Sequence, residues 1–402
     1  FENLWIVAAK RTPFGAFNGS LRKLSATDLA VHAAHAALRQ STLPPEAIGH
    51  VVVGNVAQTS ADAPYISRHV ALRCGLPIET PALTINRLCG SGFQALIDAA
   101  RMIVMGESKA VLAVGTESMS QAPHVMRGLR EGLRLGAPPP LEDSLWTSLT
   151  DSYCSLPMGM TAENLAQRYG ITRREADAFA LRSQQLWAAA QRSGRFADEI
   201  VPFEPHDFAA FGLRLKDPTP MHQDESPRPD STLVGLETLR PVFRPDGIVT
   251  AGNASGIADG AGALIVAEAE WAQAQGLKPL AKVLGWSVVG VDPTIMGIGP
   301  APAIRQLLAT YELEVKDIDL FDVNEAFAPQ FLAVQRELRL PLEYCNVNGG
   351  AIALGHPLGA SGSRISANLV YELRRRGGRF GVGSACIGGG QGIAMLFEST
   401  AS

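Results

Sequence analysis

Apolar, β-branched runs of strand length alternate with helix-like segments over the first 115 residues. LWIVAA (4–9) and HVVVGNV (50–56) are typical of strands, and a helix over about 26–40 is expected between them. Ser25 and Asp28 have the spacing of a capping box at the start of that helix. This alternation predicts parallel α/β layers. The series continues with a helix near 64–74, a strand at 81–86, a helix at 90–105 and a strand at 110–115.

The same alternation returns from about residue 280. Gly377 follows the basic turn 374–376, where a helix C-cap belongs. AVLAVGTES and FGVGSACIG fall at matching places in the two series, which indicates a structural duplication. The elements expected here are strands at 280–289, 317–323, 344–348 and 379–385, and helices at 301–310, 326–338 and 359–376.

Residues 116–249, between the two series, have a different texture. They contain the proline run 138–140, further scattered prolines and one clear helix. That helix is expected to begin at a capping box of Thr172 and Glu175 and to end at Gly194. An insertion of this kind usually shapes a ligand tunnel or an oligomer contact.

Composition describes a well-buried globular enzyme. The chain has 402 residues, of which 46% are hydrophobic and 18% charged, and this length favours two or three packed units. The net charge of -4 argues against a nucleic-acid partner, because phosphate binding needs a basic face. No stretch approaches the apolar run of about 20 residues that a membrane helix needs, and we expect no membrane span.

The cysteines and histidines give no sign of a disulfide framework or a metal site. Five cysteines without a CxxC pair favour free thiols in a reducing compartment. His32 and His35 are one helical turn apart and could share a metal, but the Ala-rich helix offers no carboxylate or thiol partner. We therefore expect no metal.

Three glycine-rich segments carry one reactive side chain each. Two thiols and an imidazole, far apart in sequence but each in backbone that can approach a ligand closely, suggest a site built from both halves of the fold. Such a site suits acyl-thioester chemistry. The segments are NRLCGSGFQAL (86–96) with Cys89, NGGAIALGHPLGASGSR (348–364) with His356, and GSACIGGGQGIA (383–394) with Cys386.

Cys89 lies where a predicted strand gives way to a helix that begins near Gly90. The positive end of the helix dipole should lower the pKa of the thiol and favour a nucleophilic thiolate. The alternative is a small buried hydrophobe. Gly90, Gly92 and Ala95 also fit the G-x-G-x-x-A pattern of a dinucleotide site, but no acidic residue closes a second strand at the expected distance.

His356 and Asn324 each allow a catalytic and a structural interpretation. Pro357 disfavours a helical conformation at His356, and an imidazole on a loop can act as a base toward a thiol. A lone histidine is otherwise often structural. Asn324 follows a predicted strand, where it could orient a water or a carbonyl, or cap the next helix.

Cys386 precedes the triple glycine 388–390. Consecutive glycines let backbone N–H groups turn toward one point, which is a way to build an oxyanion hole. The structural alternative is a tight turn with an incidental thiol.

Over nearly its whole length the chain resembles the thiolase family. Within that family, EDSLWTSLTD, LPMGMTAENLA and DPTIMGIGP are most similar to the mitochondrial type of 3-ketoacyl-CoA thiolase. The segments that carry the resemblance are KRTPFG, NRLCGSG, GTESMSQAP, TAENLA, VTAGNASGIADGAGA, NEAFAPQ, NGGAIALGHPLGASGSR and GSACIGGGQG.

The resemblance implies a duplicated α/β thiolase fold, in which two similar halves with mixed sheets pack in αβαβα layers beside an inserted loop domain. Residues 1–117 with about 250–272 would form the N-terminal half, and 273–402 the C-terminal half. Residues 118–249 would form the loop domain, which shapes the CoA tunnel and oligomer contacts. A homodimer or homotetramer is expected.

The resemblance also implies roles for single residues. Cys89 would be the acylated nucleophile, His356 its activator, and Cys386 the acid/base for the second thiol or the α-carbon proton. One oxyanion site would combine His356 with a water on Asn324, and the other would use the backbone N–H groups of Cys89 and Gly388. The positions expected along CoA are Arg228 near the adenine, Ser255 on the pantetheine arm, and Leu149, Met158, Phe243 and Phe327 in the tunnel.

The activity implied is CoA-dependent cleavage of 3-ketoacyl-CoA to acetyl-CoA and a shortened acyl-CoA, with the reverse Claisen condensation, by a ping-pong route through acyl-Cys89. CoA is a substrate, and no cofactor is expected. Acetoacetyl-CoA-specific biosynthetic thiolases typically have histidine in a YHMG motif, where this chain has LPMG with Pro157. That departure weakens the biosynthetic alternative.

Two different protein classes are compatible with parts of the same pattern. A decarboxylating ketoacyl synthase generally has histidine or asparagine in place of the second thiol, so Cys386 speaks against it. A catalytically silent acyl-CoA-binding protein would not need all three reactive residues. A regulatory disulfide between Cys89 and Cys386 would be an added layer. The excess of arginine over lysine favours a bacterial cytoplasm, with the mitochondrial matrix as the alternative.

Overall fold

The N-terminal strands form one half of a continuous mixed sheet. The computed structural model describes residues 3–136, 139–216 and 218–400. Along this half the strand order is β4-β3-β5-β10-β1, in which β3 is parallel to β4 and β5, while β10 is antiparallel to β5 and β1. The strands are β1 (Leu4–Arg11), β3 (His50–Gly54), β4 (Ala82–Ile85), β5 (Ala110–Ser118) and β10 (Ala258–Glu268), with β2 (Gly15–Ala16) paired to β10.

The C-terminal strands repeat this topology in the order β12-β13-β14-β11. The first pair is parallel and the next two pairs are antiparallel, which matches β3-β5-β10-β1 in the N-terminal half. The two halves join where Trp5 and Ile6 of β1 pair with Lys282 and Ala281 of β11. The repeated topology confirms the predicted duplication. The strands are β11 (Ala281–Gly290), β12 (Leu320–Val323), β13 (Phe380–Ile387) and β14 (Gln391–Ser399).

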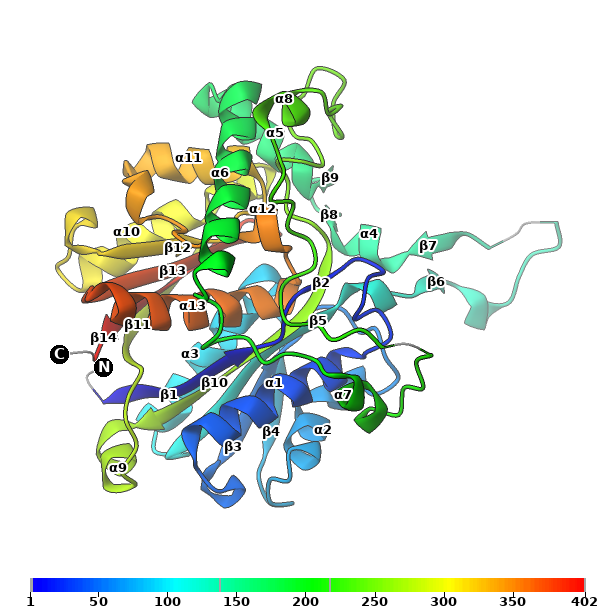
Figure 1. Ribbon diagram of the computed structural model, residues 1–402. Coiled ribbons are helices and arrows are strands. Elements are labelled where there is room, and N and C mark those ends of the chain that lie inside the picture. Colours follow the sequence, from blue (N-terminus) through cyan, green and yellow to red (C-terminus); the bar gives the residue numbers. More distant parts are fainter. Residues whose placement is uncertain (1–2, 137–138, 217, 401–402) are drawn as a thin grey trace.

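Helices complete the predicted αβαβα layers (Figure 1). Two helices pack on the outer face of the N-terminal strands, two lie outside the C-terminal strands, and two fill the space between the strand sets. In that order they are α1 (Ala26–Ser41) and α2 (Ile66–Arg73), α10 (Pro300–Thr310) and α11 (Ala328–Leu338), and α3 (Ser91–Val104) and α13 (Ser361–Arg376).

The central helices α3 and α13 touch at their first turns. A Cβ atom on Gly92 would lie 2.5 Å from the backbone nitrogen of Ser363, so only glycine allows this approach. Cys89 precedes one helix and His356 precedes the other. The close crossing therefore brings the two reactive segments to the same end of the central layer.

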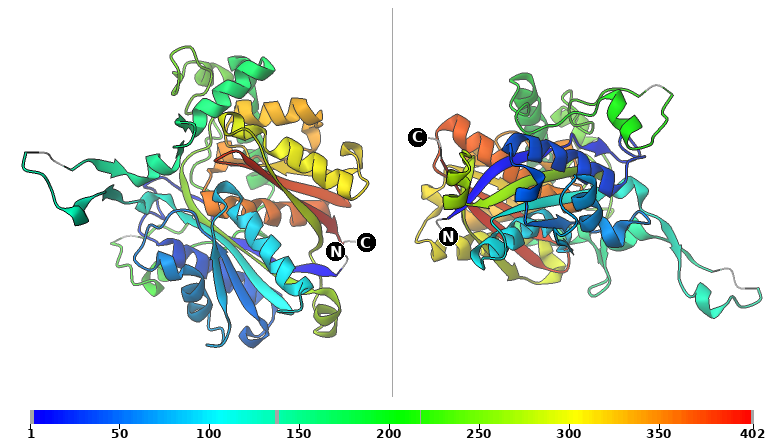
Figure 2. Two further views of the ribbon diagram at one scale, coloured as in Figure 1. Left: turned by 180° about the vertical axis from the view of Figure 1, so that it is seen from behind. Right: turned by 90° about the horizontal axis from the view of Figure 1, so that it is seen from below.

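The segment between β5 and β10 adds smaller elements around the same end. Two short hairpins form there, and the one built on β6 and β7 extends away from the body as an arm (Figures 1 and 2). The assignment of 118–249 as a separate loop domain stays a prediction. Its strands are β6 (His124–Met126), β7 (Leu141–Asp143), β8 (Thr150–Asp151) and β9 (Leu156–Pro157), and its helices are α4 (Ser144–Ser148), α5 (Met158–Tyr169), α6 (Arg173–Arg192), α7 (Pro205–Ala210) and α8 (Leu233–Glu237).

Local signals placed the helix ends well. Both predicted capping boxes are present, at Ser25 with Asp28 and at Thr172 with Glu175. Gly377 caps α13 in the left-handed conformation with φ 65°. Within the described ranges, no helix has the length and apolar character that a bilayer crossing requires.

The strand predicted at 344–348 is wrong. A 3-10 turn occupies Leu342–Tyr344, and only an isolated parallel bridge joins Cys345 to Phe321 of β12. Asn346 is left-handed with φ 47°, and its side-chain amide bonds both backbone groups of Val323. The hydrogen bonds of the Asn346 side chain to Val323 thus replace the backbone hydrogen bonds that a strand would form.

The longest elements that the sequence did not predict are two strands and one helix, namely β10, β14 and α5. Both strands are central to the sheet, and the helix leads from the β8–β9 hairpin to α6. In β10, Cβ atoms on Gly260 and Gly262 would meet Phe14 and Ser363 within 3.0 Å, so tertiary packing accounts for residues that disfavour a strand locally.

Candidate active site

Cys89 lies in a 3-10 turn (Leu88–Gly90) between β4 and α3. The preceding Leu88 has a left-handed φ of 46°, a strained conformation for a branched side chain. Cys89 is partly buried and lines a cavity of about 260 Å³. The turn therefore presents the thiol to the cavity at the entrance of the central helix.

The expected lowering of the Cys89 pKa is wrong. Burial raises the pKa of the Cys89 thiol to about 11, although hydrogen bonds from the backbone of Gly388 and of Cys89 itself oppose the rise. The helix end stabilises the thiolate, whereas burial destabilises it by removing its hydration. Burial has the larger effect, so the pKa rises. The resting residue is a neutral thiol that needs a base.

His356 lies on the loop between the short helix α12 (Ala351–Leu354) and α13. Its Nδ1 is 2.5 Å from Ser361 Oγ, and the Ser361 hydroxyl donates to the carbonyl of Pro357 at 3.0 Å. The Ser361 oxygen then accepts from Nδ1–H, and this network assigns a lone pair to Nε2. Burial lowers the pKa of His356 to about 4, with a smaller contribution from Arg364. At neutral pH the imidazole is an unprotonated base.

Asn324 faces this imidazole. Its Nδ2 lies 3.3 Å from His356 Nε2, and its buried Oδ1 has no hydrogen-bond partner among the described residues. The alternative of a helix cap is wrong, because Phe327 is the N-cap residue of α11 and receives no side-chain cap bond. The amide oxygen of Asn324 is therefore available to a group in the site, while its amide nitrogen contacts the imidazole.

Cys386 lies near the end of β13 with 1% of its surface exposed. Burial raises the pKa of the Cys386 thiol above its usual range, and the neighbouring Cys89 raises it further. The residues that follow the two cysteines are in contact, since a Cβ atom on Gly90 would lie 2.7 Å from Ile387 Cδ1, and both cysteines are free thiols. Cys386 packs with Met296 and Ala326, which themselves line the cavity.

The residues predicted for the pantetheine tunnel line this cavity. Phe243 and Phe327 meet edge to face with ring centroids 6.3 Å apart. A Cβ atom on Gly159 would overlap the Phe243 ring at 2.0 Å, so glycine makes room for this aromatic wall. Of the predicted positions, Cys89, His356, Leu149, Met158, Phe243, Ser255 and Phe327 line the cavity.

Arg228 lies outside that cavity, in an adjoining groove of about 730 Å³. Ala254, Gly256 and Ile257 line both hollows, so the groove and the cavity adjoin along this segment. The Arg228 backbone N–H donates to Gln184 Oε1 at 2.8 Å, which holds the groove wall on α6. The positions predicted for CoA thus lie in two adjoining hollows, and the cavity is the one that contains Cys89.

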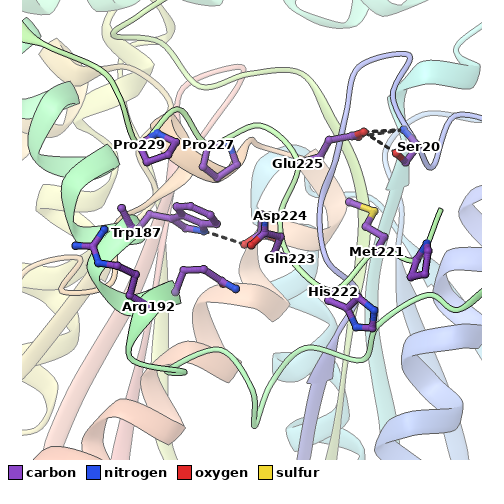
Figure 3. Close-up of a pocket in the computed structure, with 13 residues that line it drawn as sticks. Ser20, Trp187, Arg192, Met221, His222, Gln223, Asp224, Glu225, Pro227 and Pro229 are labelled. Carbon is purple, nitrogen blue, oxygen red and sulfur yellow. Dashed lines mark hydrogen bonds between the residues drawn. The ribbon is translucent and has the colours of Figure 1, made fainter.

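A separate hollow of about 470 Å³ contains none of the predicted site residues (Figure 3). Its acidic side chains are engaged within the protein, because Asp224 accepts from Trp187 Nε1 at 3.2 Å and Glu225 accepts from Ser20 Oγ at 2.6 Å. Asp224 also pairs with buried Arg11 at 2.6 Å. The hollow has structural carboxylates and no reactive group comparable with Cys89.

Several site residues could not be singled out from the sequence. Ser361 orients His356, and its only signal was its place five residues further on in the same motif. Glu117 in GTESMS is a buried carboxylate that bonds Gly359 in the His356 loop. Met119, Trp146, Val242, Met296 and Leu358 are further apolar side chains in the lining of the cavity.

The comparisons with known proteins agree with this architecture. A duplicated α/β fold with two thiols and an imidazole around one deep cavity defines an acyltransferase. Models of the thiolase N-terminal and C-terminal domains match residues 4–270 and 277–399. The chain belongs to the thiolase family.

Relatives match over their full length. Human mitochondrial 3-ketoacyl-CoA thiolase is 56% identical over 400 residues, 100% of this chain and 99% of that protein. Acetyl-CoA acetyltransferase of Chromobacterium violaceum is 45% identical over 98% of both chains. A crystal structure of the human enzyme in complex with CoA superposes with a TM-score of 0.95, covering 100% of this chain and 98% of that one at 56% identity.

Proposed function

We propose that this thiolase cleaves 3-ketoacyl-CoA with CoA, giving acetyl-CoA and a shortened acyl-CoA, and catalyses the reverse condensation. The proposal rests on one observation: Cys89 and His356 line the same cavity, and Cys386 packs against Met296 and Ala326 in the wall of that cavity. Two sulfurs and one base around a single substrate suit a reaction with two half-reactions.

In the first step His356 removes the proton from Cys89. Because the pKa of Cys89 is raised and that of His356 is lowered, the pair rests as a neutral thiol and a neutral imidazole. Nε2 carries the lone pair that accepts the proton as the sulfur bonds to the C3 carbonyl carbon of the substrate.

Two groups of donors serve the oxygens that gain charge. The amide of Asn324 beside His356 supports one oxyanion site, either directly or through a water. The backbone N–H groups of Cys89 and Gly388, which already bond the Cys89 sulfur, support the second. Preorganised donors of this kind contribute about 3 kcal/mol each to transition-state stabilisation.

Cys386 supplies the proton that carbon–carbon cleavage requires. When the C2–C3 bond breaks, the acetyl-CoA enolate takes the Cys386 proton, and acetyl-CoA leaves. Burial keeps that proton on sulfur at neutral pH, which suits an acid that must quench a strongly basic carbanion. The Cys386 thiolate then deprotonates the incoming CoA. The CoA sulfur attacks the acyl-Cys89 thioester, and His356 returns its proton to the departing Cys89.

CoA would lie along the adjoining groove and cavity. We expect Arg228 near the adenine, because it lines the groove, and Ser255 beside the pantetheine arm, because it lines the cavity. The apolar wall of Leu149, Met158, Phe243 and Phe327 would exclude water from the thioester, which strengthens the electrostatic interactions of the site.

A spectrophotometric assay of acetoacetyl-CoA loss with added CoA tests the proposal. We expect turnover by the wild-type protein and a fall of more than about 10³-fold for Cys89→Ser. Cys154→Ser is the matched control, since Cys154 is a partly exposed thiol outside the cavity lining. Normal thiolysis by Cys89→Ala would overturn the assignment of the nucleophile, and binding of acyl-CoA without turnover by the wild type would support a silent binder.

A narrow acetoacetyl-CoA specificity is the second candidate, because acetyl-CoA acetyltransferases are also among the relatives. Pro157 lines the cavity where such relatives carry an imidazole in the YHMG motif, and this favours a broader substrate range. Values of kcat/KM for 3-ketoacyl-CoA of increasing chain length decide between them: a steep fall beyond four carbons would support the narrow enzyme.

We also propose a homodimer or homotetramer. The edge strand β4 has open backbone groups and a 40% exposed Leu83, and the arm carries exposed Leu133 and Leu141. Light scattering of the purified protein measures the assembly. The cellular location stays a prediction: the arginine-rich composition favours a bacterial cytoplasm, whereas the names of the mammalian relatives favour the mitochondrial alternative.

A further inference from the structure

Glu117 is a buried carboxylate that the mechanism above does not use. It is the penultimate residue of β5 and has no exposed surface. Oε1 accepts from Asn55 Nδ2 and from the Ala57 backbone N–H, both at 3.0 Å. Oε2 accepts from the backbone N–H groups of Val56 at 3.2 Å and Gly359 at 2.9 Å.

These four donors come from two halves of the molecule. Residues 55–57 follow β3 in the N-terminal half, whereas Gly359 belongs to the turn that begins at His356. The turn sits directly on the end of β5, since a Cβ atom on Gly359 would lie 2.5 Å from the Thr116 carbonyl and 3.1 Å from Glu117 Oε2. Glu117 is thus the side chain that ties the His356 turn to the 55–57 loop.

The hydrogen bonds define the charge of this carboxylate. All four partners are N–H donors, so an ionised carboxylate satisfies them, whereas a protonated one would have a hydrogen without an acceptor. Burial raises the pKa of Glu117 to about 7, these backbone donors oppose the rise, and Asp259 on β10 adds to it. Val56, whose N–H bonds Glu117, and Cys89 pack against the same apolar cluster of Met119, Leu145 and Leu358, so the carboxylate lies near the nucleophile. Its charge raises the pKa of Cys89.

We propose that Glu117 is a positioning residue, which holds the His356 turn in register with the Cys89 turn and places a negative charge near the nucleophile. The inference deepens the proposed thiolase function and depends on it. The positioning role needs the length and the acceptor oxygens of the side chain. The electrostatic effect on Cys89 needs only its negative charge.

Two substitutions separate these parts. Glu117→Gln removes the charge and replaces acceptor sites with an amide NH₂ that faces N–H donors, whereas Glu117→Asp keeps the charge but withdraws both oxygens. We expect kcat for thiolysis to fall about 10- to 100-fold in both variants, with KM for CoA within threefold of wild type, because misplacement by about 1 Å has an effect of that size.

Alkylation of Cys89 by iodoacetamide at pH 9, followed by peptide mass spectrometry, measures how the Glu117 charge affects the thiolate fraction of Cys89. Glu117→Gln should raise the alkylation rate at least about twofold, because loss of a like charge increases the thiolate fraction, and Glu117→Asp should leave it unchanged. Glu107→Gln is the matched control, since Glu107 is an exposed glutamate just before β5, and wild-type values are expected for both readouts.

The outcomes that overturn the inference are distinct. A kcat within twofold of wild type in folded Glu117→Gln would remove the positioning role, and an unchanged alkylation rate would remove the charge effect. If Glu117→Gln fails to fold by circular dichroism, Glu117→Asp decides the positioning role by the same kcat criterion. An inactive wild-type protein would instead refute the thiolase function itself.

Discussion

Ser361 Oγ lies 2.5 Å from His356 Nδ1, at the start of the same helix that closes against α3. The hydroxyl also donates to Pro357, so the serine accepts from the imidazole and fixes which nitrogen carries the proton. Both residues lie in one motif of the sequence. Their hydrogen bond makes Nε2 the basic atom, and that atom faces Asn324.

Ser361→Ala should therefore lower kcat without weakening CoA binding. Loss of the hydroxyl removes the hydrogen bond that holds Nδ1, and the ring can then adopt the unproductive tautomer. We expect kcat to fall about tenfold, with KM for CoA unchanged in steady-state assays. Ser193→Ala, on the exposed end of α6, is the control. A wild-type kcat for Ser361→Ala would contradict the tautomer assignment.

The raised pKa of Cys89 predicts a distinctive alkylation profile. In His356→Ala, which lacks the base, the rate of Cys89 alkylation should track the thiolate fraction. Because the pKa is raised to about 11, that rate should climb about tenfold per pH unit between pH 8 and 10. Iodoacetamide labelling with peptide mapping measures it. A plateau at the pH of an ordinary thiol, near 8.5, would mean that the helix end outweighs burial.

Cys386→Ser should separate the two half-reactions. A serine hydroxyl is a far weaker acid than a thiol, so protonation of the enolate and exchange of the α-proton should slow, while Cys89 can still be acylated. We expect α-proton exchange of acetyl-CoA in D₂O, followed by NMR, to fall more than about 10²-fold. Mass spectrometry should still detect acyl-Cys89. Loss of acylation together with exchange would place Cys386 in the first step instead.

Gly362→Ala tests the crossing of the central helices. A Cβ atom there would lie 2.3 Å from the backbone nitrogen of Phe93, so α3 and α13 must separate. We expect a destabilisation of about 1–3 kcal/mol in urea unfolding and a drop in kcat of about 10²-fold. Gly290→Ala, where an added Cβ meets nothing within 4 Å, should leave both unchanged. Equal values for the two variants would show that the crossing does not set the geometry of the site.

Sequence patterns were reliable wherever neighbouring residues decide the structure. The capping boxes at Ser25 and Thr172, the Gly377 cap and the alternation of elements depend on hydrogen bonds and burial within a few residues. Sequence patterns failed where contacts between residues far apart in the chain determine the local structure. The 344–348 segment lost its strand to the side chain of Asn346, and β10 became a central strand despite Gly260 and Gly262.

The sequence by itself determined which reactive groups the protein has: the two thiols, the imidazole and the glycine-rich backbone around them, along with the family to which they belong. Only the tertiary structure decided their chemical state. Burial raised the pKa of Cys89, against the direction that its helix position suggested, and lowered that of His356. Desolvation depends on atoms from every layer of the fold, so no local pattern contains it. Glu117 likewise gained its place in the site only when the two halves met, because its donor Gly359 lies 242 residues further along the chain.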